Sequence, residues 1–305
     1  MELAAVILVS VVLCLLTIIF SRRYVVKTFD SIDAILDGIM KKDAELPFEP
    51  AADTRLSKLA HKAVKIIRMN KADISKTKQE KEIIQSFISD MSHQMKTPLS
   101  GIRMYTDLLL EGNVTYAERQ EFLSRIRAGA EKLQWLMDSL VKMSRLEAGA
   151  IALSPVPASI KQTISDSISN VYAAAAKKGI SINTACFDDV LLYHDRKWTC
   201  EAMVNILENA VKYSEPDGKI DITLETLPLY TRISITDYGI GISPDEWNAI
   251  FKRFYRGKNA KTTDGAGLGL YLASLILEKQ GGYILVDSKP GQHTTFSMFL
   301  QNCKK

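Results

Sequence analysis

Two stretches of the chain repeat apolar residues at alternating steps of four and three. The first repeat consists of Ile84, Ile88, Met91, Met95, Pro98, Ile102, Tyr105 and Leu109. The second consists of Phe122, Ile126, Gly129, Leu133, Leu136, Leu140 and Met143. This spacing is typical of helices that pack against other helices. Between them, Gly112 suits a helix end and Thr115 with Glu118 has the spacing of a capping box, so residues 81–150 predict an antiparallel helical hairpin.

A single hairpin leaves much of its two apolar stripes exposed to water. Two hairpins together bury these stripes in a four-helix bundle. We therefore expect the chain to form a homodimer through this region.

The first predicted helix carries a histidine on the face opposite its apolar stripe. His93 lies two residues from both Met91 and Met95, which is about 200° around the helix from each. A lone histidine is more often structural than reactive, but here other side chains already fill the packed face. His93 is therefore predicted to face solvent.

Pro98 lies close to this histidine within the helical repeat. It removes an amide donor and clashes with the carbonyl group of Gln94, at a cost of about 3 kcal/mol. Proline alone is equally compatible with the end of a helix, but the apolar repeat continues to Leu109 and favours a bent, continuing helix. Thr97 shares the face of His93. A second domain could reach an imidazole exposed beside such a bend.

An apolar run from Leu3 to Phe20 is about long enough to cross a bilayer. Arg22, Arg23 and Lys27 follow it, and the positive-inside rule then places the rest of the chain in the cytoplasm. A cleaved signal peptide is the alternative, disfavoured by the lack of a basic start and of a small-residue cleavage site. We predict that residues 1–21 form a single-pass anchor in the cytoplasmic membrane. The short N-terminus then lies outside, and we expect no extracytoplasmic sensor domain.

Beyond Pro155 and Pro157, which mark a linker, the pattern changes to alternating helices and strands. Helices are predicted over residues 159–178, 196–214 and 268–280. Strands are predicted over residues 181–185, 190–194, 219–226, 230–237, 283–286 and 294–300. The expected product over residues 155–305 is an α/β sandwich, in which a mixed sheet carries helices on one face.

This α/β region contains two blocks of polar residues and glycines that are candidates for a binding site. Asn205 and Asn209 lie one helical turn apart, and Lys212 and Tyr213 follow them. Amide oxygens are suitable Mg²⁺ ligands, and a nearby lysine suits phosphate. The second block consists of Asp237, Gly239 and Gly241, directly after a predicted strand. In isolation, the asparagine pair would usually be incidental, and the second block could equally be an ordinary turn with a carboxylate.

Two further blocks follow. Residues 250–257 are aromatic and basic, and could equally anchor a helix end in the core with Arg253 and Arg256 in solvent. The last block is glycine-rich and includes Gly265, Gly267, Leu268 and Gly269. It does not match the dinucleotide fingerprint, and the chain has no P-loop motif. Glycines at the start of a helix free backbone amides, which favour anions.

Together these motifs resemble those of bacterial sensor histidine kinases. Residues 92–99, SHQMKTPL, resemble the phospho-acceptor box of that family. The four later blocks occur in the order found in the GHKL-type (Bergerat) ATP-binding fold of histidine kinases, gyrase, Hsp90-type chaperones and MutL. The resemblance covers about residues 87–300. It implies that His93 takes a phosphate from ATP and passes it to an aspartate of a cognate response regulator.

The resemblance also implies roles for individual residues, with ATP and Mg²⁺ as cofactors. Asp237 would accept from the adenine amino group, and Asn209 would hold Mg²⁺. Residues 258–264 would form a short lid, whose closure the neighbouring glycines allow. Arg253, Arg256, Lys258 and Lys261 are all candidates for contact with the γ-phosphate. The remaining residues assigned to the nucleotide are Asn205, Lys212, Tyr213, Gly239, Gly241, Gly265, Gly267, Leu268 and Gly269.

One position departs from the family pattern. The family has Asp or Glu directly after the histidine as a base, whereas this chain has Gln94, which can orient the ring but cannot take a proton. Asp90, three residues before His93, is the nearest alternative carboxylate. Two alternatives stay open: a phosphatase-dominated or scaffold protein with vestigial kinase activity, and an ATPase of the same fold with another role.

Residues 22–80 are predicted to be a helical linker. A short helix around residues 32–39, a proline-containing connector and a second helix resemble, in arrangement only, the signal-relay linkers of sensor kinases. The stimulus would then arise within the membrane or through a neighbouring membrane protein.

Composition narrows the class of partner. The 305 residues carry a net charge of +4, which is small and spread out, so nucleic acid is not indicated as a partner. The four cysteines have no paired spacing for zinc or a redox pair, as expected of free thiols in a reducing compartment.

Overall fold

The structure is a computed structural model, which describes residues 2–41, 55–258 and 265–303. Within its first two helices, the side chains at 2–9, 11, 31, 34–41, 55–57, 59–61, 63, 79–80 and 83 also lie outside the description. The chain divides into two compact units, Met1–Ser86 and Phe87–Lys305.

The first unit is helical. It contains α1 (Glu2–Lys41) and the first part of α2 (Arg55–Glu111). Separate helices were expected over the apolar run and around residues 32–39, but α1 is continuous through both. The predicted connector lies outside the described residues. Within the described part of the chain, none of the helices combines the length and apolarity that a membrane span needs.

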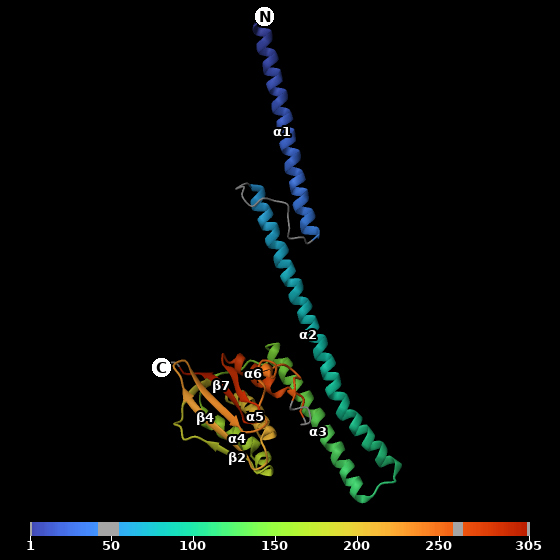
Figure 1. Cartoon of the computed structure of the whole chain (residues 1–305), viewed down its shortest axis with the longest axis vertical. Coiled ribbons are helices and arrows are strands. Elements are labelled where there is room, and N and C mark those ends of the chain that lie inside the picture. The colour runs from blue at the N-terminus through green and yellow to red at the C-terminus, as the bar shows by residue number, and fades with distance from the viewer. Residues whose placement is uncertain (1, 42–54, 259–264, 304–305) are drawn as a thin grey trace. The chain divides into compact units, whose positions relative to one another are not determined.

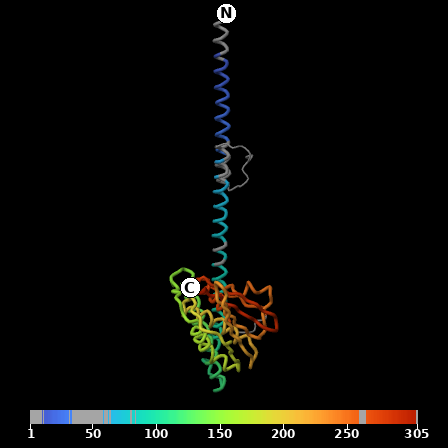
Figure 2. The backbone as a smooth tube through the Cα atoms, turned by 90° about the vertical axis from the view of Figure 1, so that its left-hand side faces the viewer, coloured from blue at the N-terminus to red at the C-terminus, as the bar shows by residue number. Residues whose placement is uncertain are grey.

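The second unit begins with a helical hairpin, made of α2 from Phe87 onward and α3 (Tyr116–Glu147). The two helices run side by side in both views (Figures 1 and 2). The rings of Tyr105 and Phe122 are in contact, tilted by 34° with their centroids 5.3 Å apart. The predicted capping box is present at the start of α3, where the Thr115 hydroxyl accepts from the Glu118 amide and the Glu118 carboxylate accepts from the Thr115 amide.

Pro98 does not end α2. The helix continues beyond it to Glu111, as the apolar repeat predicts, and the proline ring is buried. Gly129 of α3 lies at the same level, where a Cβ atom would come within 2.9 Å of Ile102 Cγ1. The small residue therefore lets the two helices approach closely beside the proline.

The α/β region follows the hairpin. Its helices are α4 (Ile160–Lys177), α5 (Arg196–Tyr213) and α6 (Gly269–Lys279), with a short 3₁₀ helix, η1 (Pro244–Glu246). Its main sheet contains β2 (Ser181–Thr184), β4 (Lys219–Thr226), β5 (Tyr230–Asp237), β6 (Tyr283–Lys289) and β7 (His293–Gln301). The strand order is β2-β4-β5-β7-β6, with β2 and β4 parallel and the other pairs antiparallel, which confirms a mixed sheet.

One strand was not expected. β1 (Val156–Ser159) pairs antiparallel with β3 (Leu191–His194) in a separate two-stranded sheet. The sequence favours a linker here because proline at 157 cannot donate to a strand ladder and is confined to sheet edges. The structure places β1 at such an edge, where pairing on one side is sufficient.

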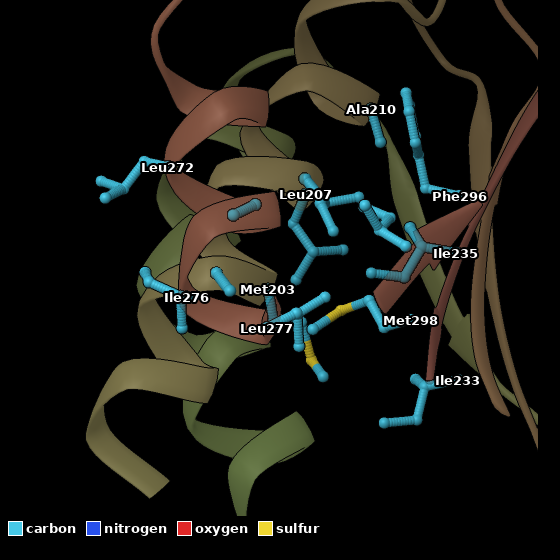
Figure 3. Close-up of a cluster of buried hydrophobic side chains, with 14 of the residues drawn as sticks. Met203, Leu207, Ala210, Ile233, Ile235, Leu272, Ile276, Leu277, Phe296 and Met298 are labelled. Carbon is cyan, nitrogen blue, oxygen red and sulfur yellow. The ribbon is translucent and has the colours of Figure 1, made fainter. Parts of the chain in front are cut away.

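The core lies between one face of the main sheet and the helices (Figure 3). β5 alternates along its length, with Thr231, Ile233, Ile235 and Asp237 all buried. Because successive strand residues point to opposite faces, these four share the helix-covered face. Asp237 thus ends a row of core residues, and the strand holds its carboxylate at the edge of the core.

Candidate nucleotide site

A cavity of about 440 Å³ lies at this edge of the core. The size is within the range of small-molecule sites. It is lined by α5, by the segment after β5, by residues 255–257 and by the glycine-rich block. The predicted site residues that line it are Asn205, Asn209, Lys212, Tyr213, Asp237, Gly241, Gly265, Gly267 and Gly269.

The first side of the cavity comes from α5. Asn209 Nδ2 donates to the carbonyl oxygen of Asn205 at 2.9 Å, and Asn205 Nδ2 donates to that of Glu201 at 2.8 Å. These bonds orient both amides, so that the Asn209 Oδ1 atom is the one left for a cation. Lys212 Nζ lies 4.7 Å from the centre of the Tyr213 ring, which is close enough for a cation–π contact.

The second side holds the buried carboxylate of Asp237. The side chain is 3% exposed, and burial raises its pKa to about 6. The amide of Gly239 donates to Asp237 Oδ1 at 3.0 Å, which partly opposes that rise. A Cβ atom at Gly239 would overlap the carbonyl oxygen of Tyr213, so only glycine lets the loop pass the end of α5. Gly239 thus shapes the site without lining the cavity.

The glycine-rich block closes the third side. Gly267 has φ +71°, and a Cβ atom there would overlap the carbonyl oxygen of Tyr255. Its own carbonyl oxygen accepts from the Phe254 amide at 2.9 Å. The block is thereby held against residues 254–256. Leu268 is fully buried behind it and is not among the cavity-lining residues.

The two arginines of the aromatic-basic segment point to different places. Arg256 lines the cavity, whereas Arg253 does not and contacts Glu147 and Tyr271. Between them Phe254 has φ +58°, a left-handed conformation that is uncommon for a non-glycine residue. This local reversal separates two residues that sequence spacing places on one short segment.

Other lining residues were not expected from the sequence. Glu246 is buried and accepts from the Tyr255 hydroxyl at 2.8 Å and from the Lys258 amide at 2.9 Å. Burial raises the pKa of Glu208, and the neighbouring Glu201 carboxylate adds to that rise. Glu208 lies within the asparagine block and Glu246 lies shortly before the aromatic-basic block. Their only indication in the sequence was this closeness to predicted blocks.

The hairpin also contributes to the cavity. Ala128, Lys132 and Trp135 of α3 are lining residues. Nothing in the sequence of α3 distinguishes these positions from an ordinary helix surface. The structure alone shows that α3 covers this side of the cavity.

The cavity suits a nucleotide with its cation. In the described part of the chain, no group of three or more His, Cys, Asp and Glu side chains could hold a metal. Among the lining side chains, the Asn209 amide oxygen is of a type that suits Mg²⁺. Most of the predicted lid, residues 259–264, lies outside the described residues.

His93 is exposed on α2, as predicted, and is not among the cavity-lining residues. Thr97 Oγ1 donates to the carbonyl oxygen of His93 at 3.4 Å, and Gln94 is half-buried. The acceptor box and the cavity are thus separate features of one unit.

Two families match the chain. Residues 83–149 match the "His Kinase A (phospho-acceptor) domain", and residues 194–303 match the "Histidine kinase-, DNA gyrase B-, and HSP90-like ATPase". The matched ranges contain His93 and the whole set of cavity-forming blocks, respectively.

Several curated sensor proteins are similar to this chain. The sensor-like histidine kinase SenX3 of Mycobacterium tuberculosis is 28% identical over 218 residues, which cover 71% of this chain and 53% of SenX3. The sensor protein GacS of Pseudomonas syringae pv. syringae is 30% identical, over 72% of this chain and 25% of GacS. The signal transduction histidine-protein kinase/phosphatase MprB of Mycobacterium sp. is 30% identical, over 67% of this chain and 40% of MprB. The chain spans about half the length of SenX3 and less than half the length of GacS and MprB.

Solved structures share the fold. The ThkA histidine kinase, in complex with the response regulator protein TrrA, superposes with a TM-score of 0.62 at 17% identity, over 77% of this chain and 66% of ThkA. The histidine kinase AdeS of Acinetobacter baumannii gives 0.56 at 18% identity, over 70% of this chain and 98% of AdeS. With the phospho-acceptor domain followed by the ATPase domain, the chain belongs to the two-component sensor histidine kinases.

Proposed function

We propose that this chain transfers the γ-phosphate of ATP to His93 and then to an aspartate of a response regulator. The observation that carries the proposal is the cavity, where Asn209, Lys212 and Asp237 converge in the same unit that exposes His93. In the first step a bond forms between an imidazole nitrogen and the γ-phosphorus. The bond from that phosphorus to the bridging oxygen breaks, and ADP leaves.

Roles for the cavity residues follow from their chemistry. The Asp237 carboxylate would accept from the adenine amino group, which fixes the base at the buried end. Asn209 would hold Mg²⁺, which neutralises phosphate charge when bound. Lys212 and Arg256 are the cations that line the cavity beside the glycine-rich block, so they would contact the phosphates. Arg256 is assigned here in preference to Arg253, which lies outside the cavity lining.

The acceptor imidazole attacks through a neutral ring nitrogen and must lose its ring proton afterwards. Gln94 can hold the ring through a hydrogen bond but cannot remove that proton. Asp90 lies one turn earlier on α2 and is half-buried. We assign the proton to Asp90 or to solvent.

The relatives support a regulator as partner. MprB is named a kinase/phosphatase, and ThkA is described in complex with the response regulator TrrA. By analogy, this chain would receive a regulator at the hairpin and would also remove phosphate from it. A scaffold without transfer activity is less well supported, because residues from all four predicted blocks line the cavity.

A membrane anchor at residues 1–21 belongs to the same proposal. The apolar run of the sequence supports it, as do the exposed apolar side chains of α1. These are 47–75% exposed and comprise Val12, Leu13, Leu15, Leu16, Ile18, Ile19 and Phe20. Carbonate washing of cell membranes tests the anchor: an integral protein stays in the pellet, and release into the wash would contradict it.

The kinase proposal is tested with the purified full chain, Mg²⁺ and γ-labelled ATP. Acid-labile, alkali-stable label is expected on the wild type and is expected to vanish in His93→Ala. Asn209→Ala should also lose the label, because the cation ligand is missing. ATP binding without any label on the wild type would contradict kinase activity and favour the scaffold.

A further inference from the structure

Arg253 lies at the centre of a cluster that joins the hairpin to the ATPase domain. Its Nη2 atom donates to Glu147 Oε1 and, at 2.9 Å, to the Tyr271 hydroxyl. The Tyr271 hydroxyl in turn donates to Glu147 Oε1 at 2.6 Å. The guanidinium also lies 5.2 Å from the centre of the Phe87 ring and 4.8 Å from that of Tyr271. The cluster therefore links α2, α3, α6 and the segment after η1.

The contact is stronger than an ordinary surface ion pair. The side chains of Arg253 and Glu147 are only 25% and 33% exposed, and hydrogen bonds to Tyr271 and cation–π contacts with Phe87 and Tyr271 support the pair. Glu147 is the last residue of α3, where the negative end of the helix dipole disfavours a carboxylate. Arg253 offsets this cost only when the two domains are in contact. The carboxylate is thus placed where it gains most from the arginine of the other domain.

In this arrangement α3 occupies one side of the nucleotide cavity. Ala128, Lys132 and Trp135 line it, and farther along α3 Lys142 pairs with Glu201 of α5 at 2.7 Å. His93, on α2, is not among the lining residues. In this arrangement the cavity is bordered by α3 and not by the His93 imidazole of the same chain.

The cluster is also connected to the phosphate side of the cavity. Phe254 follows Arg253, and its ring centroid lies 5.8 Å from that of Phe87. The Phe254 amide donates to the Gly267 carbonyl oxygen at 2.9 Å. Arg256, two residues further on, lines the cavity. A rearrangement of residues 253–256 would consequently affect the domain contact and the nucleotide site together.

We propose that Arg253, Glu147, Tyr271 and Phe87 form a latch that holds the ATPase domain in a resting arrangement. Transfer of phosphate to His93 then requires the latch to open. This inference rests on the proposed kinase function, and it assigns Arg253 to control of the domain contact instead of to the nucleotide.

The test uses the full chain and the variant Glu147→Gln, which keeps the side-chain shape but removes the charge. At saturating ATP, the initial rate of His93 labelling is expected to rise about three- to tenfold, because the resting arrangement loses part of its advantage. Hydrogen exchange of the amides in residues 250–257 should become faster. Exchanging the charges, Arg253→Glu with Glu147→Arg, should return the labelling rate toward that of the wild type.

Glu131→Gln is the matched control. It lies on the same helix and breaks an ion pair of 2.8 Å with Arg127, but it is distant in sequence from the latch and is expected to leave the rate unchanged. A labelling rate of Glu147→Gln at or below that of the wild type would overturn the latch. If even the wild type takes no label, the kinase proposal fails. The latch is then tested by hydrogen exchange alone. Equal exchange rates of the amides in residues 250–257 in the wild type and in Glu147→Gln would overturn it.

Discussion

The buried carboxylate of Asp237 makes stability depend on pH. An aspartate in the unfolded chain releases its proton near pH 4, at about its ordinary pKa, whereas burial raises the pKa of Asp237 to about 6 in the folded protein. Between these values the folded state binds more protons than the unfolded state, so the free energy of unfolding falls as pH rises. Above pH 6 the penalty is constant, at about 3 kcal/mol.

Asp237→Asn should remove this penalty. At pH 7 the free energy of unfolding should rise by up to about 3 kcal/mol, and its decline between pH 4 and 6 should flatten. ATP affinity should fall about tenfold or more, because a charged acceptor is replaced by a neutral one. Denaturant titrations at pH 4, 6 and 7, with nucleotide binding measured in parallel, check both effects. If Asp237→Asn is less stable than the wild type at pH 7, the ionised Asp237 carboxylate does not lower the free energy of unfolding.

In the proposed mechanism, Gln94 is expected to limit the rate of transfer to His93. Gln94→Glu supplies a group that can take the imidazole proton, so the initial labelling rate should increase, by up to about a hundredfold for general-base catalysis. Asp90→Asn should slow the wild type if Asp90 is the substitute base, and should have no effect in the Gln94→Glu background. Unchanged labelling in Asp90→Asn would assign the proton to solvent.

At the residue scale, the sequence predicts which groups surround the nucleotide better than it predicts their direction. Asn205 and Asn209 are one helical turn apart, so their common face follows from helix geometry alone. Arg253 and Arg256 cannot be separated in that way. Their divergence depends on the positive φ of Phe254, and a non-glycine residue gives no sign of that conformation in the sequence.

At the scale of elements, the core face of the central strands should dominate stability. Ile235 of β5 is 1% exposed and lies on the face covered by the helices (Figure 3). Ile235→Ala should lower the free energy of unfolding by about 2–5 kcal/mol, through lost burial and a cavity. Thr223→Ala, at an exposed position of β4, is the control and should change it by less than about 0.5 kcal/mol. Equal effects of the two substitutions would mean that this face is not the core.

Strand and helix positions in the ATPase domain were largely predictable because alternation in β5 and the helical repeat of α5 are strong. β1 was missed since its pairing with β3 depends on a partner far along the chain, while its proline favours a linker locally. The continuity of α1 was missed for a related reason. Its apolar and polar segments differ in composition, but α1 contains no proline that would break the helix where the composition changes.

At the scale of the whole molecule, the two sides of α3 are used differently. Leu136, Met143 and Leu146 are buried against the ATPase domain core. Leu123, Met137 and Val141 are 45–53% exposed, and their spacing places them together on another side of the helix. Water is an unfavourable environment for such a stripe, which a second hairpin would cover.

Leu123→Glu should therefore weaken a homodimer. A charge in the stripe would have to be buried without a partner, so the dimer dissociation constant should rise at least about tenfold. Light scattering of the full chain over a range of concentrations measures this shift from the mass of two chains toward that of one. Leu285→Glu is the matched control, since Leu285 is 54% exposed on β6 and outside the hairpin. A wild type that stays monomeric at every concentration would contradict the four-helix bundle, whereas dissociation by Leu285→Glu alone would move the interface to the sheet.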